Sequence, residues 1–141
     1  VFAREGAKLV LSDLHADQGA AILQEITDAG CEATFIAANV AKAEDCEAMV
    51  SHVEKSFGRL DVAFNNAGHI GVQQPLHAYP ATEYERILDV NVKGTWNCVR
   101  AELPLLLKSK GGAVVNMSSA AGVIGMGGMA PYVMAKHAII G

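Results

Sequence analysis

Short hydrophobic runs alternate with segments of helical periodicity along this chain. Four apolar runs, each ending at or next to a polar residue, are predicted to be buried strands: 8–13, 32–38, 61–65 and 113–117. Between and after them, apolar residues recur at helical spacing over 16–29, 43–57, 82–108 and from about 131 onward. This β-α-β-α-β-α-β-α order predicts an α/β fold with a parallel sheet covered by helices on both faces.

Local signals predict where several of these helices begin and end. Gly30 and Gly58 follow the first two helical segments, and glycine commonly ends a helix. Thr82 with Glu85 three residues later has the form of a capping box, which predicts the start of the third helix at Thr82. Pro104 is expected to kink that long helix near its end.

Polar residues stand where the predicted strands end. They are Asp13, Asn39, the segment Asn65-Asn66-Ala67-Gly68, and Ser118-Ser119. In a parallel sheet the carboxyl ends of the strands form the usual ligand site. Their coincidence at one edge predicts a nucleotide site there, although each alone is also typical of an ordinary turn.

Asp13 bears on the choice of nucleotide. An acid at the end of such a strand accepts hydrogen bonds from the adenosine ribose hydroxyls and repels a 2′-phosphate. The next residue is Leu14 rather than arginine, which favours NAD over NADP. A helix N-cap before Ala16 explains Asp13 about equally well on position alone; the other strand-end residues favour the nucleotide interpretation.

Tyr132 and Lys136 are four residues apart and share one face of the last predicted helix. A free phenol, with a pKa near ~10, is a poor base at neutral pH. A nearby ammonium stabilises the phenolate, most strongly in a desolvated site. A bare Y-x-x-x-K is usually a solvated surface pair. Ser119, 13 residues before the tyrosine at a strand end, favours an acid/base site instead.

Composition excludes several classes of function. The net charge is −4 and no basic block is present, so nucleic acid and anionic membranes are not expected partners. No apolar run has the roughly 18 residues of a transmembrane helix, and no signal peptide is visible. The cysteines and histidines form no metal-binding pattern, so no metal site is predicted, and a reducing cytoplasm is the expected location.

The glycine-rich segment 122–128 permits two interpretations. It follows a strand and precedes a helix, as a phosphate-binding loop does, but no further unit of that motif follows. A loop beside the substrate is the preferred interpretation. Val92 and Trp96, on the long helix, are expected to be core or subunit contacts.

The chain begins at Val1 and ends at Gly141 inside helical patterns, without convincing caps. We therefore expect residues 1–141 to be a single, partial domain of a longer protein.

Taken together, these motifs resemble the short-chain dehydrogenase/reductase family over essentially the whole length. The matching stretches are EGAKLVLSD, NNAG at 65–68, NVKG at 91–94, VVNMSSAAG and YVMAK at 132–136. The resemblance implies an incomplete Rossmann-like doubly wound parallel sheet. It also implies an NAD(P)-dependent oxidoreductase that transfers hydride between nicotinamide and a secondary alcohol or carbonyl substrate.

The resemblance assigns roles residue by residue. Tyr132 would be the general acid/base, and Lys136 would bind the nicotinamide ribose and favour the phenolate. Ser119, rather than Ser118, would orient the substrate oxygen, and Asn91 would hold a water that links the lysine to solvent. Tyr132 and Lys136 are also expected cofactor contacts, and the others are Asp13, Asn39, Val40, Asn65, Ala67 and Gly68.

Two departures from the family pattern stand out. Asn39 occupies a position that is usually aspartate, although its amide oxygen can still accept from the adenine amino group. The family's first strand, its glycine-rich loop, its last two strands and its substrate-binding segment have no counterpart here. Because the first strand normally lies between the strands at 8–13 and 61–65, we expect an opening in the middle of the sheet. The isolated chain is accordingly expected to bind NAD poorly and to be inactive, and the intact parent to be active.

Alternatives to this assignment exist within and outside the enzymes. An epimerase or dehydratase of the related extended fold also uses Y-x-x-x-K, but the NNAG and SSAAG stretches favour the reductase. A catalytically silent nucleotide-binding or interaction protein is the other alternative, and the presence of all four candidate catalytic residues argues against it. By the resemblance, the intact parent is expected to be a homo-oligomer, a tetramer or dimer, paired through the helix at 82–108 and the final helix.

Overall fold

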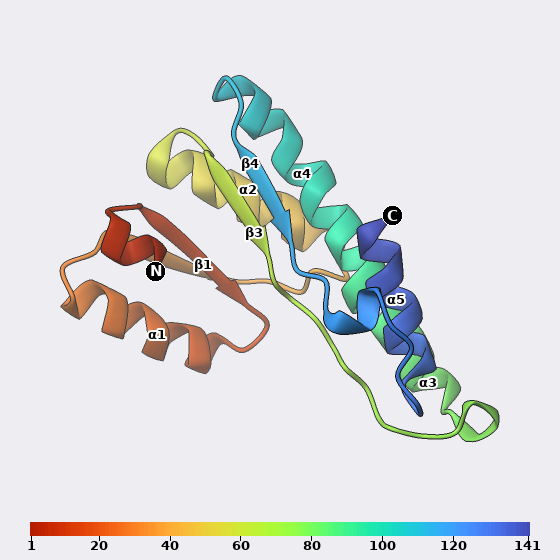
Figure 1. The fold of residues 1–141 in the computed structure, drawn as a ribbon. Helices are drawn as coiled ribbons and strands as arrows, with labels where there is room; N and C mark the ends of the chain where they lie inside the picture. Colours follow the sequence, from red (N-terminus) through yellow and green to blue (C-terminus); the bar gives the residue numbers. More distant parts are fainter.

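The computed structural model describes all 141 residues as alternating strands and helices (Figure 1). The strands are β1 (Leu9–Asp13), β2 (Ala33–Ala37), β3 (Val62–Asn65) and β4 (Ala113–Asn116). The α-helices are α1 (Ala16–Asp28), α2 (Ala43–Phe57), α3 (Ala81–Ile87), α4 (Gly94–Lys108) and α5 (Ala130–Ile140). A π-helix (Leu88–Lys93) joins α3 to α4, and short 3₁₀ helices cover Phe2–Glu5, Leu76–Ala78 and Ala120–Gly122. None of the helices combines the length and the apolar character needed to cross a membrane.

The strands form two separate parallel pairs. β1 pairs with β2, with Asp13 opposite Ala37, and β3 pairs with β4, with Asn65 opposite Asn116. No hydrogen-bonded ladder joins β1 to β3. The predicted parallel α/β architecture is confirmed, and the sheet is open between β1 and β3, where the sequence predicted the opening.

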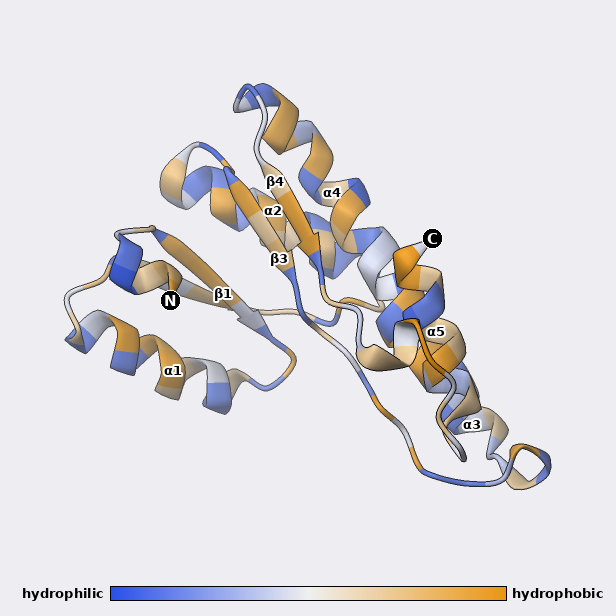
Figure 2. Cartoon of the chain, viewed as in Figure 1, coloured by the Kyte–Doolittle hydropathy of each residue, from blue (hydrophilic) through white to orange (hydrophobic).

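The opening leaves apolar side chains of β3 in contact with solvent. Val62 and Phe64 are each 46% exposed, whereas strands in the middle of a parallel sheet are ordinarily buried on both faces. Figure 2 shows that β1, β3 and β4 are nevertheless predominantly hydrophobic. The residues of these strands are those of a buried sheet, but in this chain the side chains of β3 are only partly buried.

Helices pack against each strand pair. α1 packs on β1 and β2, and Gly19 of α1 lies so close to Phe35 of β2 that a Cβ there would be 1.9 Å from the ring. α2 contacts β1, β2 and α4 and so connects the two strand pairs. At the α2–α4 contact the Sγ atoms of Cys46 and Cys98 lie 3.7 Å apart, and burial raises the pKa of both thiols.

The helix predicted over residues 82–108 is divided into α3, the π-helix and α4. The predicted capping box is wrong: Pro80 is the N-cap of α3, the Tyr84 amide donates to the Pro80 carbonyl, and Thr82 lies within the first turn without a capping bond. Pro104 lies inside α4, which continues to Lys108. Trp96 is 69% exposed and is not a core residue.

Candidate active site

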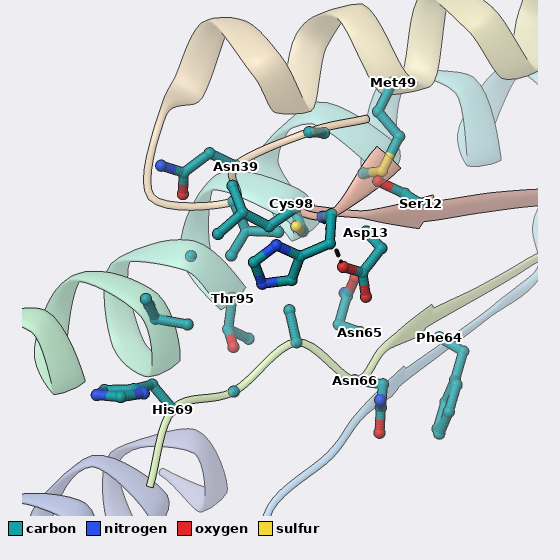
Figure 3. Close-up of a pocket in the computed structure, with 18 of the residues that line it drawn as sticks. Ser12, Asp13, Asn39, Met49, Phe64, Asn65, Asn66, His69, Thr95 and Cys98 are labelled. Carbon is teal, nitrogen blue, oxygen red and sulfur yellow. Dashed lines mark hydrogen bonds between the residues drawn. The ribbon is translucent and has the colours of Figure 1, made fainter. Parts of the chain in front are cut away.

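A cleft of about 370 Å³ lies where the strands end, within the usual size range of small-molecule sites. Figure 3 shows Asp13 and Asn39 on one wall and the segment carrying Asn65, Asn66 and His69 on the other. Of the predicted cofactor contacts, those that line this cleft are Asp13, Asn39, Val40, Asn65, Ala67 and Gly68. The strand ends that are far apart in the sequence are therefore brought to one site.

The carboxylate of Asp13 is exposed at the end of β1. Its Oδ1 accepts a hydrogen bond from the His15 backbone N–H at 2.8 Å, which closes the turn into α1 (Figure 3). Its Oδ2 accepts no hydrogen bond within the protein. The N-cap of α1 is His15, so the alternative interpretation of Asp13 as the helix N-cap is wrong. Asp13 closes the local turn with one oxygen, and the other is available at the cleft.

Asn39 is used within the protein more than the sequence suggested. Its Oδ1 accepts from the Ala41 N–H at 3.0 Å, and its backbone N–H donates to Asp45 Oδ2 at 2.8 Å. The amide oxygen expected to meet the adenine amino group therefore already closes a turn. The adjacent Val40 lies against α4, because Gly94 has no side chain and a Cβ there would be 2.7 Å from Val40 Cγ2.

The Asn65 side chain connects three elements. Its Nδ2 donates to Glu102 Oε2 of α4 at 3.1 Å and to Asn116 Oδ1 of β4 at 3.0 Å. Both hydrogens are spent on protein acceptors, so the side chain supports the start of the 65–68 segment, and Ala67 and Gly68 follow it along the cleft. Glu102 was missed at the sequence level, although an acid within the apolar stretch AELPLLL is itself unusual.

Glu102 is only 4% exposed. Burial raises the pKa of its carboxyl group, and the hydrogen bond from Asn65 partly opposes that shift.

Asn91 is fully buried in the π-helix. Its Nδ2 donates to the carbonyl oxygens of His69 at 2.8 Å and Ile87 at 2.9 Å, and its Oδ1 accepts from the His69 N–H at 3.3 Å. With both amide hydrogens on carbonyl oxygens, the orientation of the amide is unambiguous. Oδ1 faces the segment that follows β3.

Lys136 of α5 is 3% exposed, and its Nζ donates to the Met117 carbonyl oxygen at 2.8 Å. The Nζ lies 5.7 Å from the centre of the Tyr132 ring. Burial lowers the pKa of the Lys136 ammonium. The predicted tyrosine–lysine pair is thus partly enclosed by protein instead of lying on a solvated helix surface.

Gly68 lies between Asn91 and Lys136. A Cβ at this position would be 3.0 Å from Asn91 Oδ1 and 3.6 Å from Lys136 Nζ. The absence of a side chain therefore lets the π-helix and α5 approach the same stretch of backbone from two sides. The structure brings Asn91 and Lys136 together at this glycine, and the Tyr132 ring lies beside Lys136.

The two serines after β4 have different partners. Ser118 Oγ donates to the Lys136 carbonyl oxygen at 2.8 Å. Ser119 Oγ accepts from the Ala121 N–H at 3.2 Å as the N-cap of the 3₁₀ helix, which packs on α5. Ser118 spends its hydroxyl hydrogen on the backbone, whereas that of Ser119 is not donated within the protein.

Comparison with known proteins identifies the family. The family described as short chain dehydrogenase matches residues 1–141. The chain is 39% identical over 142 residues to the A-factor type gamma-butyrolactone 1'-reductase (1S-forming) of Streptomyces virginiae, covering 100% of this chain and 55% of that protein. It is 35% identical over 141 residues to the cyclohexanol dehydrogenase of Acinetobacter sp. (strain SE19), covering 100% of this chain and 56% of that protein.

A solved structure gives the same result. The crystal structure of NAD+-bound xylitol dehydrogenase superposes with a TM-score of 0.95 at 33% identity, covering 98% of this chain and 53% of that one. The chain spans about half the length of the curated relatives it matches. Together with the cleft and the residues around Gly68, these matches show that the chain belongs to the short chain dehydrogenase family.

Proposed function

We propose that the whole protein is an NAD(P)-dependent oxidoreductase that interconverts a secondary alcohol and its carbonyl compound, with Tyr132 as acid/base. The observation that carries this proposal is the arrangement around Gly68. A buried ammonium, Lys136, lies beside the Tyr132 ring, and the amide oxygen of buried Asn91 faces the same glycine. Buried charges beside a titratable side chain are characteristic of sites that move protons.

The residues at the strand ends fit the adenosine part of the cofactor. The cleft has a free carboxylate oxygen at Asp13 and a glycine-containing wall at 65–68, which permits close approach to a flat ligand. The Asp13 charge favours ribose hydroxyls over a 2′-phosphate, so NAD is the proposed cofactor. Because Asn39 Oδ1 is engaged with Ala41, we assign the adenine contact at this position to Val40 and to the free Nδ2 of Asn39.

Side chains of this protein would transfer the proton of the substrate hydroxyl. When bound, nicotinamide supplies the hydride chemistry. Tyr132 takes the hydroxyl proton during oxidation and returns it during reduction, and the Lys136 ammonium would bind the nicotinamide ribose. Ser119, whose hydroxyl hydrogen is free, donates to the substrate oxygen. Asn91 Oδ1 accepts from a water beside Lys136, which connects the site to solvent.

The relatives suggest the substrate class, and the surface suggests an assembly. Their names, a gamma-butyrolactone reductase and a cyclohexanol dehydrogenase, support a small alcohol or ketone as substrate. On α4, exposed Trp96, Leu103 and Leu107 recur at helical spacing. Such an apolar stripe favours a homo-oligomer, dimer or tetramer, paired through this helix.

The proposal is tested by assaying the whole protein with NAD and NADP on a panel of secondary alcohols and ketones, beside the Tyr132→Phe variant. Removing the phenolic oxygen should lower kcat by roughly 10²- to 10⁴-fold, the usual contribution of general acid–base catalysis. NAD affinity, measured by calorimetry, should change little. Tyr84→Phe is the matched control, since Tyr84 is exposed on α3 and should retain the wild-type rate.

Two outcomes would contradict the proposal. An unchanged rate for Tyr132→Phe would remove its acid/base role. Tight NAD binding without turnover on any substrate of the panel would favour the catalytically silent nucleotide-binding alternative.

A further inference from the structure

His69 connects the segment after β3 to helix α3 through its side chain. Its Nε2 lies 3.0 Å from Glu83 Oε2, and both side chains are about one-quarter exposed. A pair that is largely withdrawn from solvent is less screened than a surface pair. The other carboxylate oxygen of Glu83, Oε1, lies 4.0 Å from the more exposed Arg86, so Oε2 is left to the imidazole.

The backbone of the same residue holds Asn91. The His69 carbonyl oxygen accepts from Asn91 Nδ2, and the His69 N–H donates to Asn91 Oδ1. The second hydrogen of Nδ2 goes to Ile87, the last residue of α3. Asn91 therefore depends on two pieces of chain for its orientation, the segment at His69 and the end of α3.

The His69–Glu83 contact joins these same two pieces directly. Glu83 is four residues before Ile87 on α3, and His69 follows Gly68. The segment also packs on α3 at Gly71, where a Cβ would lie 2.5 Å from Ile87 Cδ1, and the His69–Glu83 bond adds a directional side-chain contact between the same two pieces. The His69 backbone is thus bonded to Asn91 and the His69 side chain to Glu83, and together these contacts oppose a shift of the segment relative to α3.

We propose that His69 and Glu83 act together as positioning residues for Asn91. Their side-chain hydrogen bond fixes the segment after Gly68 against α3, so that the Asn91 amide oxygen stays directed at the point shared with Lys136. This inference rests on the proposed function, because it assumes that Asn91 takes part in the reaction. Neither residue has to touch the substrate or the cofactor for this role.

The test compares kcat and KM in the whole protein for His69→Leu, Glu83→Ala and the double variant. Misplacing a reacting group by about 1 Å can lower the rate about 100-fold, so each single variant should lower kcat by roughly 10- to 100-fold. KM for NAD should stay within about twofold in Glu83→Ala, because Glu83 does not line the cleft. The double variant should be no slower than the slower single variant, because both substitutions remove the same His69–Glu83 hydrogen bond.

Two further variants separate positioning from general destabilisation. His69→Gln keeps a side-chain donor for Glu83 and should recover most of the rate lost in His69→Leu; it also carries the test if the leucine variant does not fold. Glu85→Ala is the control on the same helix, exposed and without a partner, and should have the wild-type kcat.

A wild-type kcat in His69→Leu and Glu83→Ala would overturn the inference. So would losses that multiply in the double variant, or a loss in His69→Gln as large as in His69→Leu. Tyr132→Phe, measured in parallel, keeps the two proposals apart. If it is inactive while the His69 variants are fully active, the positioning role fails and the proposed function stands; if it is active, the proposed function itself fails.

Discussion

Ser118 of the β4 end donates a hydrogen bond to the carbonyl oxygen of Lys136 at 2.8 Å. In the opposite direction, the Lys136 ammonium donates to the carbonyl oxygen of Met117, the residue before Ser118, also at 2.8 Å. The turn of α5 that carries the lysine is thus tied to the end of β4 through its backbone and through its side chain. The position of the candidate acid/base pair depends on this junction.

Gly122 makes the same junction possible, and its replacement is the first prediction. A Cβ at Gly122 would lie 2.4 Å from Ser118 Oγ and 2.8 Å from the Lys136 carbonyl oxygen. Gly122→Ala should therefore separate the 3₁₀ helix from α5 and lower the free energy of unfolding by about 1–3 kcal/mol, with a loss of kcat. Urea denaturation and steady-state kinetics of the whole protein measure both effects.

Gly125→Ala is the matched control on the same loop. No atom lies within 4 Å of its added Cβ, and its backbone is not in the left-handed region. Both variants behaving alike would show that the Gly122 contact has no special importance.

Glu102 gives the second prediction, a dependence of stability on pH. Burial raises the pKa of its carboxyl group in the folded state above the unfolded value. Below the unfolded pKa, near 4.3 for a free glutamate, the group is neutral in both states and costs nothing. As pH rises through the folded pKa, the folded protein must bury a charge, and stability falls.

Glu102→Gln removes that charge and keeps an oxygen that can accept from Asn65 Nδ2. The variant should be more stable than the wild type at pH 7 and equal to it near pH 4, as measured by urea denaturation at both values. A variant that is less stable at pH 7 would mean that the carboxylate is held by interactions stronger than its burial cost.

Asp13 gives the third prediction, on cofactor preference. With Asp13→Asn the turn bond to the His15 N–H can persist, but the negative charge beside the ribose is lost. Loss of a charged hydrogen bond costs about 1.5–3 kcal/mol, so NAD binding should weaken roughly 10- to 100-fold. The ratio of kcat/KM for NADP to that for NAD should rise.

Asp17→Asn, an exposed substitution in the first turn of α1, serves as the control and should leave this ratio unchanged. An unaltered ratio in Asp13→Asn would assign cofactor choice to other residues.

The isolated 141-residue chain gives the fourth prediction. Its strands form two pairs with no ladder between β1 and β3, and apolar residues of β3 are exposed. We expect it to bind NAD weakly in calorimetry and to show no turnover, whereas the whole protein binds and reacts. Turnover by the isolated chain would contradict this prediction.

The sequence by itself determined most of the secondary-structure elements and the edge of the sheet at which the cleft lies. Strands, helices and the glycine after α2 follow from periodicity and from local turn chemistry, which depend on residues close together in the chain. The same is true of the Tyr132–Lys136 spacing, because a helix places residues four apart on one face. The position of the opening between β1 and β3 also followed from the sequence, through the family resemblance.

Tertiary structure decided what each polar group does. Asn65 contacts Glu102 and Asn116, which are 37 and 51 residues away, and no local pattern announces such partners. The π-helix at Asn91 and the bond from His69 to Glu83 likewise arise only when separate elements pack together. Local periodicity reports which face of an element is apolar, whereas the partner of a buried amide or carboxylate is chosen by whichever element packs against it.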